Sequence, residues 1–282
     1  ELQSQSLITL LPKPDKDTTH LKNWRPISLL NTDYKIASKA IANRIKSVLP
    51  NIITESQTGF IKGRYIGENI RLLEEILDYV EDSNTECLLF FSDFEKAFDS
   101  VDHNFLISTL KHFNFGDSFI RWVNVFYNNI KSSVTNNGFI TDFFPIERGV
   151  RQGCPLSPYL FIIAIEPLSQ LISKHPNIKG IKIANVEVKN TLFADDATFV
   201  MDGSKTSFES LISVLDEFEK ISGLKLNKSK CNVLKAGALK TKKDIYLEQK
   251  AFHWSSDCAK ELGINFTTNR QDTLKLNLDP KI

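Results

Sequence analysis

Two adjacent carboxylates, Asp195 and Asp196, stand between two apolar stretches at 191–193 and 197–200. These flanks predict the two strands of a hairpin, with the acids at its turn. Adjacent carboxylates beside apolar strands repel each other and lose hydration, which raises their pKa values unless a cation neutralises them. A divalent metal ion is the simplest such cation. An acidic hairpin turn without a ligand is the alternative, because Asp is common in turns.

Asp93 supplies a third carboxylate, at the end of a predicted buried strand over 87–91. Burial of a lone Asp there costs free energy unless its carboxylate has a partner. That partner is a metal ion or, as the alternatives, the N-terminus of a helix that Asp93 caps or a basic side chain in a salt bridge. If this strand lies beside the hairpin, Asp93 meets Asp195 and Asp196, although 102 residues of separation do not establish that contact. Three hard oxygen ligands suit Mg²⁺, and two such ions about 4 Å apart clamp the oxygens of a phosphoryl transfer.

The elements that must position these acids follow from hydrophobic periodicity and from turn residues. The pattern predicts a hairpin over 132–141, where Asn136-Asn137-Gly138 supplies the positive φ angles of a tight turn. The other predicted strands lie at 8–11, 186–188, 191–194 and 198–201. The predicted helices lie at 33–48, 68–80, 103–113, 117–129, 159–173 and 206–221. Pro50 ends the first of these helices, and Gly223 caps the last. Hairpins mixed with helices, without regular βαβ alternation, indicate an α+β fold.

Seven segments, in order along the chain, resemble the motifs of a reverse transcriptase of the non-LTR (LINE-type) retrotransposon class. They are KNWRPISLL at 22–30, QTGFIKGR at 57–64, DFEKAFD at 93–99, RQGCPLSP at 151–158, FADD at 193–196, GLKLNKSK at 223–230 and LGI at 262–264. Phe193 in front of the double Asp is found in many LINE-type enzymes. Any one segment is a weak signal, whereas seven in the right order argue against chance.

The resemblance implies a right-hand polymerase fold, with fingers at about 1–85 and a palm at about 86–265 that contains interleaved fingers elements. The palm is expected to hold an antiparallel sheet backed by helices. Residues 266–282 are then the start of a truncated thumb or connection. The chain does not begin with Met, which fits a segment excised from a longer protein.

The same resemblance implies RNA-directed DNA synthesis from a primer 3′-hydroxyl, as part of a retrotransposon polyprotein. The expected partners are an RNA template, a DNA primer and deoxynucleoside triphosphates. Asp93 and Asp195 are expected to bind both Mg²⁺ ions, with Mn²⁺ as a substitute, and Asp196 to support the ion on the primer side.

Basic residues of the predicted fingers are implied to pair with the triphosphate. They are Lys62, Arg64 and Arg71, and solvated charges at the start of a helix are the alternative. Lys230 is expected to reach toward the active site.

Two uncharged residues are implied to contact the nucleotide. Gln152 is expected to line the nucleotide pocket, because Gly149 and Gly153 beside it let the backbone approach a ligand; a plain loop is the alternative. Phe98 is expected to pack beneath the incoming sugar and to exclude a 2′-hydroxyl, and a core aromatic at the start of a helix is the alternative.

A run of lysines without any acidic residue covers 221–243. The run predicts salt-sensitive, sequence-independent contact with the backbone of the template–primer duplex, and a solvated or flexible surface is the alternative. Apart from Lys230, its members are Lys225, Lys228, Lys235, Lys240, Lys242 and Lys243.

The composition is that of a globular protein, with 41% apolar and 24% charged residues among 282. Thirty-five basic against 34 acidic residues give a net charge of +1, which argues against a nucleic-acid binder unless positive charge is concentrated locally.

No apolar run approaches the ~20 residues that span a bilayer, so no membrane partner is expected. Four widely spaced cysteines fit free thiols in a reducing compartment. We therefore expect an intracellular protein, in the nucleus or in a cytoplasmic ribonucleoprotein, and not a secreted one.

Two other functions remain open on the sequence. A group II intron maturase is a related lineage, but Phe193 stands where that lineage usually has Tyr. A catalytically inactive polymerase fold that serves as an RNA-binding scaffold is the rival from another class, and the three intact carboxylates argue against it. The sequence predicts no oligomeric state.

Overall fold

The computed structural model describes residues 4–242 and 252–278, which form two compact units. Each unit combines segments that are not consecutive in the chain. The first contains residues 4–52, Lys96–Ala164 and Ile221–Gly223, and the second contains Ile53–Glu95, Ile165–Lys220 and the described residues from Leu224 onward. The boundaries predicted at 85 and 265 do not coincide with these segments, and the division into fingers, palm and thumb stays a prediction.

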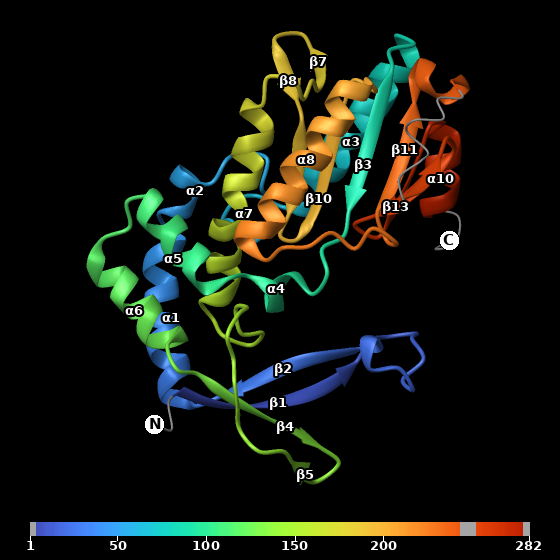
Figure 1. Cartoon of the computed structure of the whole chain (residues 1–282). Coiled ribbons are helices and arrows are strands. Elements are labelled where there is room, and N and C mark those ends of the chain that lie inside the picture. The colour runs from blue at the N-terminus through green and yellow to red at the C-terminus, as the bar shows by residue number, and fades with distance from the viewer. Residues whose placement is uncertain (1–3, 243–251, 279–282) are drawn as a thin grey trace. The chain divides into compact units, whose positions relative to one another are not determined.

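The sheet of the first unit has the strand order β2-β1-β4-β5, with β6 also paired to β4 (Figure 1). Its strands are β1 (Gln5–Pro12), β2 (Trp24–Leu30), β4 (Lys131–Asn136), β5 (Phe139–Ile140) and β6 (Phe144–Pro145). The predicted hairpin around Asn137 and Gly138 is confirmed, with φ of 48° and 82° at those residues. Strand β2 was not predicted because Pro26 interrupts its pattern. As an edge strand, β2 tolerates a residue without an amide hydrogen.

The three longer helices of the first unit follow the predicted apolar periodicity, whereas its two four-residue helices were not predicted. The helices of this unit are α1 (Thr32–Lys46), α2 (Leu49–Ile52), α4 (Ala97–Ser100), α5 (His103–His112) and α6 (Asp117–Tyr127), with a short 3₁₀ turn, η2 (Leu21–Asn23). The helix predicted to continue to 48 ends at Lys46, and Pro50 lies inside α2 instead, where the first turn of a helix accepts proline. Helix α7 (Ser157–Lys174) carries the chain from the first unit into the second.

The central sheet of the second unit has the strand order β12-β11-β3-β10-β9. Its strands are β3 (Cys87–Ser92), β9 (Asn190–Phe193), β10 (Asp196–Met201), β11 (Asn232–Ala236) and β12 (His253–Ser255). Strand β3 runs antiparallel to both β10 and β11, and all six of its residues are buried. Burial on both faces explains why β3 is an uninterrupted apolar run rather than an alternating one.

Helices cover both faces of this sheet (Figure 1). Helix α3 (Ile66–Asp82) packs Leu73 and Val80 into one core cluster with Leu89 and Phe91 of β3. Helix α8 (Lys205–Ser222) lies on the opposite face, where Phe208 contacts Phe90 with ring centroids 6.3 Å apart. An antiparallel sheet backed by helices was predicted for the palm. The helix-backed sheet of the second unit is antiparallel except at its edge, where β12 pairs in parallel with β11.

Two hairpins complete the described part of the second unit. They are β7 (Ile181–Ile183) with β8 (Val186–Val188), and β13 (Cys258–Glu261) with β14 (Ile264–Thr267). The 3₁₀ turn η3 (Gly237–Thr241) follows β11, and α10 (Arg270–Leu278) follows β14. Phe266 of β14 stacks on Phe91 with centroids 5.7 Å apart, so the second hairpin is anchored to the core. None of the described helices is both long and apolar enough to cross a membrane, and all four cysteines are free thiols.

Candidate active site

The sheet of the second unit places the three predicted carboxylates at one end of its strands. Ala194, with φ of 57°, and Asp195 form the two-residue turn between β9 and β10, and Asp196 is the first residue of β10. Ala197 of β10 pairs with Ser92, the last residue of β3. Asp93 directly follows Ser92, so this register brings it to the end of the sheet that carries Asp195 and Asp196.

The carboxylates at this end influence one another electrostatically. Burial raises the pKa of Asp195, and the charge of Asp93 raises it further. Burial also raises the pKa of Asp196 to about 6, with added contributions from Asp195 and Asp93. The pKa of Glu261 rises to about 8 through burial and through the charges of the same three Asp residues. Glu261 is thus a fourth carboxylate of this cluster.

Sequence reasoning missed Glu261. It is the last residue of β13, and Leu262 and Gly263, both at positive φ, turn the chain into β14. The segment LGI had been matched to a family turn, but the acid just before it had no special pattern. Only the packing of the β13–β14 hairpin places Glu261 in the electrostatic field of the other acids.

The chemistry of these side chains fits a hard divalent cation. Carboxylate oxygens are the ligands that Mg²⁺ prefers, and a cation offsets the repulsion that raises the pKa values of Asp195 and Asp196. Within the described residues, no group of three or more His, Cys, Asp or Glu side chains is arranged closely enough to hold a metal ion. The donor types fit the metal, whereas the spacing of the side chains does not form a closed site, and the assignment of ligands stays a prediction.

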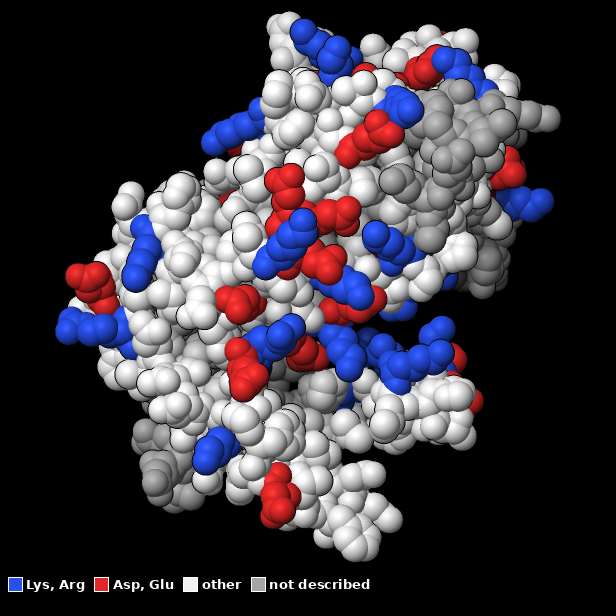
Figure 2. Space-filling view, in the orientation of Figure 1, with Lys and Arg blue, Asp and Glu red and all other residues white. Residues whose placement is uncertain are grey.

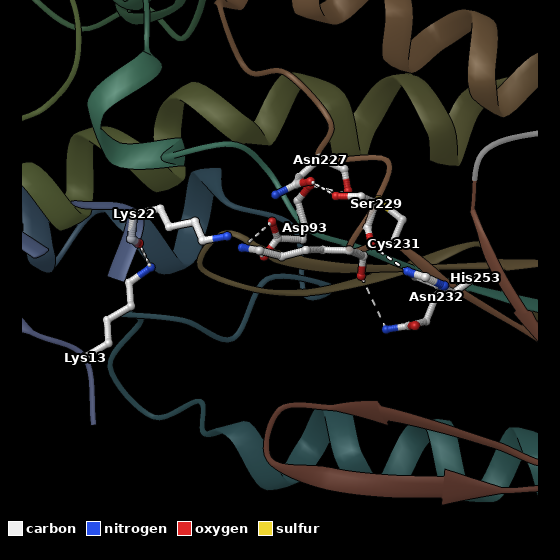
Figure 3. Close-up of polar contacts among 9 residues, drawn as sticks. Lys13, Lys22, Asp93, Asn227, Ser229, Cys231, Asn232 and His253 are labelled. Atoms are coloured by element: carbon white, nitrogen blue, oxygen red, sulfur yellow. Dashed lines mark hydrogen bonds and ion pairs between the residues drawn. The ribbon is translucent and has the colours of Figure 1, made fainter. Parts of the chain in front are cut away.

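Lys230 lies at Asp93. Its Nζ atom is 3.2 Å from one carboxylate oxygen of Asp93 and 3.4 Å from the other. The main chain beside it is tied to the same residue, because the Asn227 N–H donates to the Asp93 carbonyl at 2.8 Å (Figure 3). The structure thus brings Lys230 into contact with Asp93, and its expected role at the active site and toward a nucleotide stays a prediction.

Gln57 holds the turn that presents the two acids. Its side chain is buried, and Oε1 accepts the N–H groups of Ala194 and Gly59, both at 2.8 Å. Its Nε2 donates to the Ala194 carbonyl at 3.2 Å. Gly59 is packed so tightly that a Cβ atom there would lie 2.4 Å from the Ala194 nitrogen. Sequence reasoning included Gln57 in a matched segment but gave it no role.

The basic residues assigned to the triphosphate have different surroundings in the second unit. The Arg64 guanidinium donates to the carbonyls of Ile53, Thr54 and Gln57 at 2.5–3.1 Å and so fixes the loop that contains Gln57. Arg71 is exposed on α3, where it pairs with Glu75 at 2.7 Å, and Lys62 is also exposed. Arg64 therefore has a structural role that was not predicted, and the contacts of all three with a nucleotide stay predictions.

Phe98 and Gln152 belong to the first unit. The Phe98 ring is partly exposed and stacks on Phe161, with centroids 4.4 Å apart and planes 12° apart. Gln152 Nε2 donates to Asp99 at 3.1 Å. Both Gln152 and Asp99 line a pocket of about 360 Å³ in the same unit, together with residues of β1, β2, β4 and the loop before Gln152. A role of either residue in nucleotide binding stays a prediction.

The lysine run does not form one uniformly basic surface. Lys235 is buried on β11, and Lys243 lies outside the described residues. Acids from other segments pair with the remaining lysines: Lys225 with Glu95 at 3.8 Å, Lys228 with Asp216 at 3.9 Å, Lys240 with Glu81 at 2.5 Å and Lys242 with Glu86 at 2.5 Å. Figure 2 likewise shows acidic and basic side chains interspersed on the face that it draws. Counting charges along the sequence could not reveal these partners.

The family model described as "Reverse transcriptase (RNA-dependent DNA polymerase)" matches residues 11–266. The chain belongs to the reverse transcriptase family. It is 35% identical over 263 residues to the "Transposon TX1 uncharacterized 149 kDa protein" of Xenopus laevis. This match covers 92% of this chain and 20% of the Xenopus protein. It is 28% identical over 255 residues to the "Retrovirus-related Pol polyprotein from type-2 retrotransposable element R2DM" of Drosophila melanogaster. That match covers 87% of this chain and 24% of the Drosophila protein.

These relatives identify a LINE-type reverse transcriptase domain, as the seven segments implied, and they favour it over the group II intron alternative. The domain spans about a fifth to a quarter of the length of the two relatives. A solved telomerase from Candida tropicalis matches its fold with a TM-score of 0.66 and 13% identity, over 94% of this chain and 44% of that one. The α+β polymerase fold expected of this reverse transcriptase domain is therefore confirmed.

Proposed function

We propose that this reverse transcriptase domain extends the 3′-hydroxyl of a DNA primer on an RNA template, using deoxynucleoside triphosphates, as part of a non-LTR retrotransposon polyprotein. The observation that carries the proposal is the placement of Asp93, Asp195 and Asp196 at one end of β3 and β10. Membership of the family supports it.

The carboxylates perform the central chemistry in this proposal. Asp93 and Asp195 would hold two divalent cations, Mg²⁺ or Mn²⁺, and Asp196 would support the cation on the primer side. When bound, these cations stabilise the attacking hydroxyl oxygen and the pyrophosphate leaving group. A pKa of about 6 leaves Asp196 mostly ionised at pH 7 and able to contribute its charge. The repulsion among the acids is the electrostatic cost that cation binding removes.

The remaining residues are proposed to bind and select the substrates. Lys62, Arg64, Arg71 and Lys230 would contact the triphosphate, Gln152 would line the nucleotide pocket, and Phe98 would contact the sugar. The partly exposed ring of Phe98 supports its role, because a fully buried ring is inaccessible to a substrate. We further propose an intracellular location, in the nucleus or a cytoplasmic ribonucleoprotein, which the four free thiols support.

Primer extension on an RNA template tests the proposal. The full chain is incubated with an annealed DNA primer, the four deoxynucleoside triphosphates and Mg²⁺, and the products are sized. Template-dependent extension is the expected result. RNA binding without any extension, in Mg²⁺ or Mn²⁺, would instead favour the RNA-binding scaffold.

Replacing Gln57 with Leu is expected to lower both stability and activity. The change removes three hydrogen bonds to the backbone around the acidic turn, so the free energy of unfolding should fall by about 2–4 kcal/mol. Displacement of the turn should lower kcat for primer extension roughly tenfold or more, with little change in KM. Chemical denaturation and steady-state kinetics measure the two effects.

Gln170→Leu, which removes a single hydrogen bond to Glu166, is the control and should lower both the free energy of unfolding and kcat by less. Equal effects would argue against a positioning role for Gln57.

Neutralising Lys240, Lys242 and Lys243 together is expected to weaken template–primer binding for all sequences alike. With about one counterion released per phosphate contact, the slope of log affinity against log salt should fall by up to about three. Three lysines at about one counterion each set this upper limit, and the pairs with Glu81 and Glu86 must open before Lys240 and Lys242 contribute to it. Fluorescence anisotropy at several salt concentrations measures the slope. Lys205→Gln, on α8 and paired with Glu209, is the control. An unchanged slope would show that these lysines do not contact nucleic acid.

A further inference from the structure

The segment that carries Lys230 is fastened to Asp93 through its main chain. The Asn227 N–H donates to the Asp93 carbonyl at 2.8 Å, and the N–H groups of Lys230 and Cys231 donate to the Asn227 carbonyl at 2.8 and 3.2 Å. The Ser229 hydroxyl closes the turn by donating to Asn227 Oδ1 at 2.9 Å (Figure 3). This small turn holds the backbone of Lys230 at a constant position relative to Asp93.

A second anchor comes from β12. His253 Nε2 lies 2.7 Å from the Ser229 carbonyl oxygen, and the His253 N–H donates to the Cys231 carbonyl at 3.1 Å (Figure 3). The segment is therefore held on two sides, by the end of β3 and by the start of β12. The side chain of Lys230, by contrast, is 60% exposed and has the long flexible stem of lysine. Its backbone is fixed while its ammonium group is able to move.

The ammonium group of Lys230 contacts both carboxylate oxygens of Asp93, at 3.2 and 3.4 Å. Within the described ranges, no Lys, Arg or His side chain forms an ion pair with Asp195, Asp196 or Glu261. Lys230 is thus the positive charge that the described chain places directly on the carboxylate cluster. It occupies the same oxygens that the proposed function assigns to a divalent cation.

We propose that Lys230 is the resident counter-ion of Asp93, which holds this carboxylate in place before cation binding and leaves it when a divalent cation binds. The inference rests on the proposed function, because it takes Asp93 as a cation ligand. The two oxygens of Asp93 cannot face both an ammonium group and a dication at close range without strong repulsion between the two positive charges. Lys230 therefore competes with the cation, and cation binding releases it toward other anions.

Mn²⁺ binding to the full chain, without nucleotide or nucleic acid, tests the competition. Electron paramagnetic resonance measures the Kd of wild type, Lys230→Met, Lys228→Met and Asp195→Asn at low ionic strength. Because an exposed ion pair is weak, Lys230→Met should bind Mn²⁺ roughly two- to fivefold more tightly than wild type, and added salt should shrink the difference. Lys228→Met is the matched control. It removes an exposed lysine of the same segment, paired with Asp216 on α8, and should bind like wild type.

The wild-type chain offers a second measurement that needs no variant. An amine-reactive acetylating reagent labels exposed lysines, and mass spectrometry compares the labelling of Lys230 and Lys228. Added Mg²⁺ should accelerate labelling of Lys230 and leave Lys228 unchanged, because release from Asp93 frees the Lys230 amine. This measurement decides the question even if a Lys230 variant fails to fold.

The outcomes separate the inference from the function on which it rests. The displacement of Lys230 by the cation is wrong if Lys230→Met binds Mn²⁺ no more tightly than wild type and Mg²⁺ does not change Lys230 labelling. The proposed cation site still stands in that case if Asp195→Asn weakens Mn²⁺ binding. If wild type binds Mn²⁺ no more tightly than Asp195→Asn, both the cation site and the displacement of Lys230 by the cation are overturned.

Discussion

Asp195→Asn is expected to abolish primer extension while leaving RNA binding nearly unchanged. Removal of one carboxylate charge from the turn between β9 and β10 removes stabilisation of the charge that develops in the transition state. Loss of such an interaction typically costs roughly 10²–10³-fold in kcat. RNA affinity is expected to come instead from positive charges that pair with phosphates, and the substitution does not change any of them.

The variant is expected to stay folded. Burial and the charge of Asp93 raise the pKa of Asp195, so its ionised form is disfavoured in the native protein relative to the unfolded chain. A neutral side chain of the same size relieves that repulsion and should leave the thermal stability unchanged or slightly higher.

Extension rate and RNA affinity are measured on the same preparations of wild type and variant. Asp216→Asn, which removes an exposed acid from α8, is the matched control and should retain activity. Retention by Asp195→Asn of more than about a tenth of the wild-type rate, a loss of under about 1.4 kcal/mol of transition-state stabilisation, would contradict the assignment of Asp195 to the reaction.

Phe98→Val is expected to raise ribonucleotide incorporation by one or more orders of magnitude and to lower deoxynucleotide use modestly. The two substrates differ by one oxygen, and attraction alone discriminates weakly against an added hydroxyl. A steric clash with an aromatic ring is more effective, and a smaller side chain removes it. The ratio of kcat/KM for the two triphosphates, in wild type and variant, measures the effect.

The stacking of Phe98 on Phe161 provides a way to separate selection from packing. Phe161→Leu removes that stacking partner but keeps the ring at position 98. If Phe98 excludes ribonucleotides by its own bulk, Phe161→Leu should change the substrate ratio much less than Phe98→Val, even if both lose comparable stability. An unchanged ratio in folded Phe98→Val would make Phe98 a core aromatic and place the selection elsewhere.

Local pattern in the sequence was sufficient for much of the scaffold. The apolar stretches on either side of Asp195 and Asp196 predicted a hairpin with the acids at its turn, and the structure has Asp195 in that turn and Asp196 as the first residue after it. The run over 87–91 correctly predicted a buried strand that ends just before Asp93. Such elements depend on periodicity, turn residues and burial within a short window, and these are readable along the chain. The order of seven short segments indicated the reverse transcriptase family, and the matches to known proteins then confirmed that family.

Only the tertiary structure decided which of these residues meet. The pairing of Ser92 with Ala197 unites carboxylates that are about a hundred residues apart, and no local pattern encodes that register. The same holds for the bonds of Gln57 to Ala194, for the proximity of Glu261 to the acids and for the glutamates that pair with Lys240 and Lys242. Each depends on side chains from distant segments packing against one sheet. The sequence alone therefore determined the fold class, the family and the candidate acids. The hydrogen-bond partners and the neighbouring charges of those acids, Lys230 among them, were decided by long-range packing, because electrostatic and hydrogen-bond energies depend on distance in space and not on separation along the chain.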